Sequence, residues 1–192
     1  MNAFKLLTIA FSCLAVASCG NRAAQSTEAQ AEAAPAADTL TVDYVLAEAD
    51  SLVGQMVVIS GFCTHICKHS GRKIFLMGSD ESKSIRVEGA EIGGFAQECV
   101  SSNVTVTGVL REERVDEAYL QQWEAQAAAQ GGEEHGDKEA GCDTEKKARG
   151  EQANTTAGRI ADFRAKISER KAQCGKEYLS FYFVEAKLYE IQ

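Results

Sequence analysis

The sequence lacks the excess of positive charge that a nucleic-acid-binding surface needs. Lysine and arginine number 20 against 28 aspartate and glutamate residues, which gives a formal net charge of −8. Affinity for nucleic acid depends on neutralising phosphates with basic side chains, and an anionic membrane surface attracts basic segments in the same way. Both ligands are therefore disfavoured, and neutral, cationic or metal-containing partners remain open.

The chain also lacks a hydrophobic run long enough to span a bilayer as a helix. Such a helix needs about 20 apolar residues, and the apolar stretch from Leu6 to Val16 is shorter. Catalytic signatures are missing as well, because the sequence has no Ser/His/Asp arrangement, supported carboxylate pair, P-loop or dinucleotide fingerprint. The sequence therefore does not predict an enzyme.

The N-terminal residues have the layout of a secretory signal. One positive charge, Lys5, precedes the apolar stretch, and two small residues stand directly before Cys19. This ending resembles the lipobox of bacterial lipoproteins. The resemblance implies that residues 1–18 are a removed signal peptide and that Cys19 carries the lipid that anchors the protein to a membrane. Gly20, where an aspartate would favour the inner membrane, implies the outer membrane of the cell envelope, facing the periplasm.

The segment after the cysteine is polar. Residues 20–39 contain no large apolar side chain and hold the chain's only proline. A segment of this composition cannot bury enough surface to offset the entropy lost on ordering. We therefore expect residues 19–39 to be a lipidated cysteine with a disordered tether, and residues 40–192 to form one domain with its own core.

The remaining sequence predicts a short helix followed by five strands. Apolar residues at three- and four-residue spacings indicate a helix from Thr41 that ends before Gly54. Gly61 is the expected bend or bulge in the first strand, and residues 89–102 take the place of a helical element after the third. Alternating or β-branched runs predict the strands at residues 55–62, 73–77, 84–88, 103–111 and 177–191.

This order of elements resembles an OB-fold, a five-stranded Greek-key barrel. The residues that carry the likeness are Leu52–Gly54, Gly61, residues 64–71, Ile85–Glu88 and Phe181–Ala186. The sequence is similar to small OB-fold lipoproteins of Gram-negative bacteria, some of which are labelled nucleic-acid-binding from their fold alone. The resemblance implies a mainly β protein and a binding module whose ligand the family leaves unassigned.

A long insertion separates the fourth and fifth strands. Residues 112–175 exceed an ordinary barrel loop and include helical segments at 118–130 and 154–174, the second ending at Gly175. We expect a helical hairpin whose two apolar stripes meet, and it suits a spacer or an arm that binds another envelope protein. The stripes consist of Tyr119, Trp123 and Ala127 in the first helix and Ile160, Phe163 and Ile167 in the second.

One segment of the first half gathers four side chains of types that bind metals. They alternate over seven residues as Cys63, His65, Cys67 and His69. On an extended strand all four would share one face. Cys63 and Cys67 would then lie about 13 Å apart, too far for a mutual disulfide, and one ion could hold all four only if the chain turned. A curled segment suits zinc or cuprous copper, so a transition metal or metallo-cofactor is one hypothesis for the ligand.

Two other interpretations of this segment stay open. In the first, the cysteines are packed hydrophobic residues or disulfide partners of distant cysteines, with the histidines at the rim of the barrel. A thiol-redox role needs a thiolate with a lowered pKa, to which Lys68, His69 and Arg72 would contribute.

The number of cysteines limits the disulfides. Five remain once Cys13 leaves with the signal and Cys19 is lipidated, so at least one is free, metal-bound or intermolecular. A disulfide between Cys142 and Cys174 is conditional on a break in the helical segment between them. Cys99 is then left over.

Two alternative functions remain. The first is the binding of an oligonucleotide or oligosaccharide on the barrel face, where two aromatic side chains would stack on bases and four basic side chains would assist. The candidates are Phe62, Lys68, Arg72, Lys73, Phe75 and Arg86. Both aromatic residues also fit core packing. The second alternative is a structural envelope lipoprotein that binds another protein through its helical arm.

Overall fold

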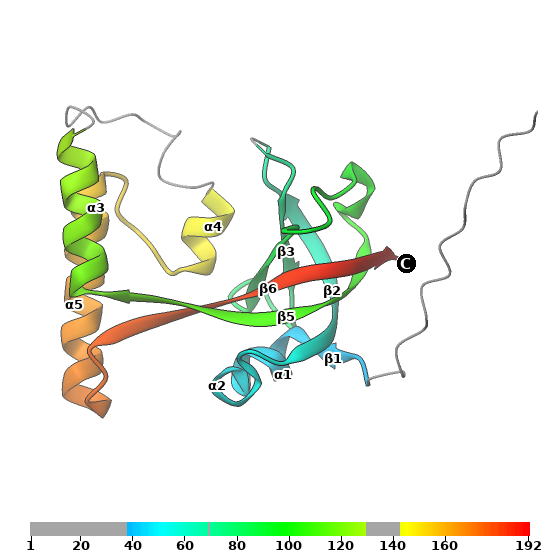
Figure 1. Ribbon diagram of the computed structural model, residues 1–192, viewed down its shortest axis with the longest axis horizontal. Coiled ribbons are helices and arrows are strands. Elements are labelled where there is room, and N and C mark those ends of the chain that lie inside the picture. Colours follow the sequence, from blue (N-terminus) through cyan, green and yellow to red (C-terminus); the bar gives the residue numbers. More distant parts are fainter. Residues whose placement is uncertain (1–37, 69, 130–142) are drawn as a thin grey trace, which may run out of the picture. The chain divides into compact units, whose positions relative to one another are not determined.

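The computed structural model describes residues 38–68, 70–129 and 143–192 (Figure 1). In these ranges the elements are β1 (Leu40–Thr41), α1 (Val42–Ala47), α2 (Ala49–Leu52), β2 (Met56–Ile66), β3 (Lys73–Met77), β4 (Ser84–Glu88), the 3₁₀ helix η1 (Gln97–Cys99), β5 (Asn103–Asp116), α3 (Glu117–Ala129), α4 (Asp143–Ala148), α5 (Thr156–Cys174) and β6 (Tyr178–Ile191). None of these helices is long and apolar enough to cross a membrane.

Five of the strands form a closed barrel. Their order is β2-β3-β4-β6-β5, and β5 pairs back with β2 to close it. Neighbouring strands are antiparallel except β4 and β6, which are parallel. The short β1 adds a sixth strand, parallel to β2. The prediction of a mainly β protein is therefore confirmed, with one strand more than expected.

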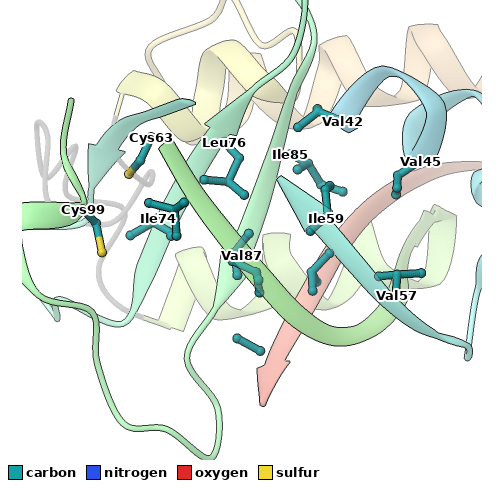
Figure 2. Packing of buried hydrophobic residues seen from close by; sticks show 14 of the residues in the cluster. Val42, Val45, Val57, Ile59, Cys63, Ile74, Leu76, Ile85, Val87 and Cys99 are labelled. Atoms are coloured by element: carbon teal, nitrogen blue, oxygen red, sulfur yellow. The ribbon is translucent and has the colours of Figure 1, made fainter. Parts of the chain in front are cut away.

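The core fills the inside of this barrel. Alternate residues of each strand point inward, and β-branched or aliphatic side chains occupy these positions. Helix α1 adds Val42 and Val45 to the same cluster, and Thr41 caps the helix by accepting a hydrogen bond from the Tyr44 amide at 3.2 Å. Figure 2 shows these valines beside Ile59 and Ile85, with the sulfur atoms of Cys63 and Cys99 in the same cluster.

Three elements differ from the sequence prediction. The helix expected from Thr41 breaks at Glu48 into α1 and α2. Only the short η1 forms within residues 89–102. Gly61 pairs regularly with Val104, so the irregularity of β2 lies elsewhere, between Cys63 and His65. The irregularity of β2 depends on its pairing with β3, which local sequence patterns do not show.

The insertion grows from a ribbon made by β5 and β6. Both strands continue past the barrel, with pairing maintained as far as Asp116 and Tyr178 (Figure 1). The insertion therefore begins at residue 117 and not at 112. Beyond the ribbon, α4 lies between α3 and α5 in sequence, so the simple two-helix hairpin that we predicted is not shown. Gly175 does end α5, in the left-handed conformation.

A second, smaller core holds this region together. Helices α3 and α5 pack against the ribbon, and four side chains are buried there: Val115, Leu120, Ile160 and Phe163. The predicted stripe of α5 is confirmed, since Ile167 packs against the same cluster. In α3 the buried residue is Leu120; of the predicted stripe, Trp123 packs against the same cluster, whereas Tyr119 remains 37 % exposed.

One glycine of β5 lies where no larger residue fits. The register of β5 and β6 shifts at Gly108, and a Cβ added there would lie 2.4 Å from the Glu185 carbonyl oxygen and 2.7 Å from a Val184 methyl carbon. We expect Gly108→Ala to lower the free energy of unfolding by about 2–3 kcal/mol, since overpacking of this kind forces the backbone to move. Urea denaturation measures the change. Thr107→Ala, on the adjacent and partly exposed position, is the matched control, and equal stability of the two variants would contradict the prediction.

Candidate functional site

A β-bulge separates side chains that the sequence predicts on one face of β2. Cys63 is paired with Leu76 and His65 with Phe75, so Thr64 is the extra residue. Residues paired across an antiparallel ladder point to the same face. Cys63 therefore points into the core with Leu76, and His65 lies on the outer face with Phe75. The prediction of a shared face is wrong for these two residues.

Several predicted sites lie outside the described residues. His69, Cys142 and Cys19 belong to this group, so the four-ligand metal site, the Cys142–Cys174 disulfide and the lipidation stay predictions. In the described ranges no group of three or more His, Cys, Asp or Glu side chains is placed to hold a metal ion. Cys67, at the end of β2, is partly buried, and Cys174 is exposed.

The buried thiols are not activated for redox chemistry. Cys63 and Cys99 are both 0 % exposed. Burial raises the pKa of the Cys63 thiol to about 11 and raises that of Cys99 above its usual value. Because the thiolate is the reactive form, a raised pKa leaves these groups protonated and unreactive at neutral pH.

This predicts selective alkylation. In native protein treated first with a non-thiol reductant, iodoacetamide at about pH 8 should label Cys174 and leave Cys63 and Cys99 unlabelled, since only the first is accessible. Peptide mass spectrometry measures each site. The denatured protein, in which all three should react, is the control. Equal labelling of Cys63 and Cys174 in the native protein would contradict the placement of Cys63 in the core.

Of the two candidates for base stacking, one is exposed and the other is buried. Phe62 is 39 % exposed, but Phe75 is fully buried. Phe75 lies on the outer face of the barrel, beneath Ala148 and Arg149 of the insertion, with which it lines a small cavity. The insertion therefore covers one of the two predicted stacking residues.

The basic candidates for nucleic-acid binding lie in different places on the domain. Lys68 is exposed after the end of β2, and the Arg72 guanidinium donates to the Ala90 carbonyl oxygen at 3.0 Å. Lys73 and Arg86 lie on the outer face, at positions paired with Glu88 and Phe75 respectively. The six candidates thus do not form one open basic surface.

A cavity of about 840 Å³ lies between the outer face of the barrel and the helical insertion, and we call it the insertion cavity. Its barrel wall is made by alternate residues of β3 and β4 together with β5 and β6. Its other walls come from α3, α4, the residues that follow α4, and α5. The side chains that line it are Lys73, Arg86, Glu88, Glu112, Glu113, Tyr119, Gln122, Trp123, Gln126, Glu145, Arg149, Arg159 and Phe183.

Helix α3 presents one complete face to the insertion cavity. Tyr119, Gln122, Trp123 and Gln126 follow the spacing of a single helix face, and all four line the cavity. Leu120, on the adjacent face, packs into the small core. The two glutamines thus lie on a helix face that borders the cavity and is held over the barrel by the packing of its neighbour, and both side chains remain exposed.

Ion pairs tie α4 to the barrel wall of the insertion cavity. Arg86 donates to Glu145 at 2.8 Å and to Glu113 at 3.1 Å. Lys73 lies 3.5 Å from the same Glu145 carboxylate. On the residues after α4, Arg149 donates to Glu113 at 2.6 Å. The Glu113 carboxylate of the barrel and the Glu145 carboxylate of the insertion therefore form ion pairs with three basic side chains.

The protonation of this network follows from its contacts. Burial opposes the ionisation of Glu113, but Arg149 and Arg86 outweigh burial and hold the pKa of Glu113 below its usual value. Burial and the Glu113 charge raise the pKa of Tyr119, whose hydroxyl lies 3.5 Å from that carboxylate. A carboxyl group whose pKa is lowered in the folded state stabilises the fold at pH values above its unfolded-state pKa, about 4.3. This stabilisation is lost as the pH falls through the folded-state pKa. Glu113 is therefore ionised at neutral pH, and the Tyr119 hydroxyl beside it stays protonated.

A buried ion pair supports the far wall. Arg159 of α5 is 5 % exposed and its Nε donates to Glu151, whose side chain is 2 % exposed. The Arg159 guanidinium also stacks over the Trp123 ring, 4.7 Å from its centroid. This contact fixes the orientation of the only tryptophan of the chain at the cavity surface.

Sequence analysis missed most of this site. Glu145, Arg149 and Arg159 were part of an insertion that we interpreted as a spacer or arm. A signal was available, because polar Gln122 and Gln126 share a helix face with the aromatic Trp123. A face that mixes amides with an aromatic ring does not suit simple helix-to-helix packing.

Comparisons with known proteins give only distant likenesses. No family model matches the chain, and no curated protein matches it. A solved structure from Leishmania major Friedlin, named as an aspartyl-tRNA synthetase, matches with 14 % identity and a TM-score of 0.29 over 44 % of this chain and 18 % of that one. A DUF3299 family protein from Pseudomonas aeruginosa PAO1 matches with 12 % identity and a TM-score of 0.29, over 44 % of this chain and 87 % of that one. These likenesses are too weak to carry an argument about fold or function.

Proposed function

We propose that this protein is a lipid-anchored binding module of the bacterial cell envelope, with an OB-type barrel and a small-molecule site in the insertion cavity. The anchor is Cys19, and the module faces the periplasm from the outer membrane. The predicted signal, the lipobox-like residues before Cys19 and the polar tether support this placement. No step of the proposal requires catalysis.

The strand arrangement supports an OB-type barrel. The strands follow the order β2-β3-β4-β6-β5 and close between β5 and β2, with β4 and β6 parallel. In OB-folds the second and third barrel strands, which correspond to β3 and β4, present the face that contacts ligands.

The single observation that carries the proposal is the position of the insertion cavity. It lies on the outer face of β3 and β4, where Lys73, Arg86 and Glu88 line it. Its volume falls within the range of small-molecule sites, roughly 300–1,000 Å³. The insertion thus converts an open barrel face into a concave site with a polar lining.

Trp123 makes the proposal testable, because the only tryptophan lines the cavity. The low-molecular-weight fraction of a periplasmic extract is added to detergent-solubilised mature protein, and tryptophan emission is recorded. We expect a saturable change in the emission spectrum. The variant Trp123→Phe, which removes the reporter, controls for fluorescence of the extract. An unchanged emission spectrum of the wild-type protein at every concentration would overturn the proposal.

A further inference from the structure

We infer that an apolar patch on the outside of the barrel rests on the surface of a zwitterionic lipid bilayer. This inference rests on the anchoring part of the proposed function and adds an orientation to it, in which one face of the barrel contacts the membrane. It follows from the exposure of the patch, from its position beside the point where the chain enters the fold, and from the paired charges at its rim.

The patch lies on the outer face of β2, β5 and β6. Val57 and Ile59 of β2 point into the core, so the residues that alternate with them point outward. Strand pairing joins these outward residues to β5 and β6, because residues paired across an antiparallel ladder share a face. We call the resulting set the barrel patch, and it consists of Met56, Val58, Thr107, Val109 and Leu188.

Two long apolar side chains of the barrel patch are exposed. Met56 is 58 % exposed and Leu188 is 55 % exposed, the largest values among the large apolar residues of the described ranges. Met56 is paired with Val109, and Thr107 is paired with both Val58 and Leu188. The exposed side chains therefore belong to one continuous surface. Single exposed apolar residues are ordinary, whereas contiguous ones mark contact with a partner or a membrane.

The described chain enters the fold at the margin of the barrel patch. Strand β1 is parallel to β2, with Leu40 paired with Ile59, so the same register places Thr39 beside Val58. The sequence that leads back to the proposed anchor, Cys19, therefore leaves the domain next to the patch. A flexible coil of about 20 residues has a typical end-to-end distance of about 25 Å. An acylated Cys19 thus holds the patch near the bilayer at a high effective concentration.

The basic side chains at the rim of the barrel patch are neutralised. Arg111 continues the outward face of β5, and its Nε donates to Glu185 at 2.8 Å. Lys187 of β6 is paired with Glu91 and lies 3.9 Å from the Glu185 carboxylate. Binding to an anionic surface depends on basic groups that are free to attract it. These pairs therefore favour a zwitterionic surface, where burial of apolar side chains is the driving force.

A second copy of the chain is the other partner that an apolar patch could contact. Stable protein interfaces use about 20–30 residues on each side, which is far more than the barrel patch contains. Contact with a bilayer needs no complementary surface, and the proposed anchor supplies the proximity. The small size of the patch therefore favours the lipid surface.

Quenching by brominated lipid tests the inference on the acylated mature protein, reconstituted into phosphatidylcholine vesicles. Met56→Trp in a Trp123→Phe background places the only tryptophan of the chain on the barrel patch. Acyl chains brominated close to the headgroup quench a tryptophan that touches them. We expect about half or more of the emission to be lost relative to unbrominated vesicles. The loss should be similar at low and high salt, because no charge is transferred.

Two controls make the test specific for the barrel patch. Gln121→Trp in the same background places the tryptophan on an exposed position of α3, and its emission should change little. Leu188→Ser, added to Met56→Trp, should reduce the quenching about twofold or more, because it removes the second exposed apolar side chain. Ile191→Ser is its matched control, since Ile191 is 40 % exposed on the same strand but is paired with Val104, on the opposite face. Equal quenching after these two serine substitutions would overturn the placement of the contact.

The outcomes separate this inference from the proposed function. If the protein floats with the vesicles and neither introduced tryptophan is quenched, the anchor holds and the membrane contact of the patch is wrong. If both are quenched equally, no face is preferred and the inference is also overturned. A dimer in sedimentation that Leu188→Ser abolishes would assign the patch to a second copy instead. If mass spectrometry finds no acyl chains on the purified protein, the proposed anchoring fails and the inference fails with it.

Discussion

Replacing Cys19 with serine is expected to move nearly all of the protein from the membrane fraction to the soluble periplasmic fraction. Each buried methylene of an acyl chain contributes about 0.8 kcal/mol to membrane binding, so two or three chains give stable anchoring. In the described part of the chain no helix offers a second means of crossing a bilayer. Cell fractionation followed by immunoblotting measures the shift.

A matched control is present in the same segment. Cys13→Ser changes a cysteine within the predicted signal and should leave the protein in the membrane fraction. Mass spectrometry of the wild-type N-terminus should show Cys19 as the first residue with acyl chains attached. A Cys19→Ser variant that stays in the membrane fraction would show that the anchoring hypothesis is wrong.

Replacing Arg159 with methionine should lower the free energy of unfolding by about 3–5 kcal/mol. The substitution leaves the Glu151 carboxylate, 2 % exposed, without its closest partner, since the nearest Arg149 nitrogen is 3.9 Å away. Removing one partner of a buried ion pair has costs of this size. It also removes the guanidinium that stacks on Trp123. Denaturant titration monitored by Trp123 fluorescence measures the loss.

Two further variants assign the cause of this loss. Arg164→Met, on the same helix, breaks ion pairs with Glu117 and Glu124 that are largely solvent-exposed, and it should change stability little. The double variant Arg159→Met with Glu151→Gln should recover part of the loss, because the buried Glu151 charge that lost its partner is then absent. If the double variant is no more stable than Arg159→Met alone, the buried charge is not the cause.

The barrel strands were the most predictable part of the structure. The runs at 73–77 and 84–88 match β3 and β4 at both ends, because alternate residues such as Ile85 and Val87 are buried while their neighbours are not. The strand that begins at Asn103 is longer than predicted. Its continuation from residue 112 to Asp116 reads Glu-Glu-Arg-Val-Asp, which has no strand-like alternation and depends on pairing with β6.

The candidate site was much less predictable. The alternation of Cys63 and His65 predicted that they share one face of the strand. A one-residue bulge at Thr64 places them on opposite faces instead. Such a bulge depends on the partner strands and leaves no mark in a single sequence. The ion pairs of the insertion cavity join residues far apart in the sequence, as in Arg86 with Glu145, which are 59 positions apart, so no local pattern reveals them.

The pairing of Asp116 with Tyr178 has a consequence for the ancestry of this chain. The two points where the helical segment leaves and rejoins the ribbon are direct neighbours, so a tight hairpin of the ordinary kind would reconnect them. A plain ancestral barrel could have acquired the whole segment in one genetic event at a hairpin tip, with its strands unaltered. The barrel face would then be the older wall of the insertion cavity, and the helical segment the newer one.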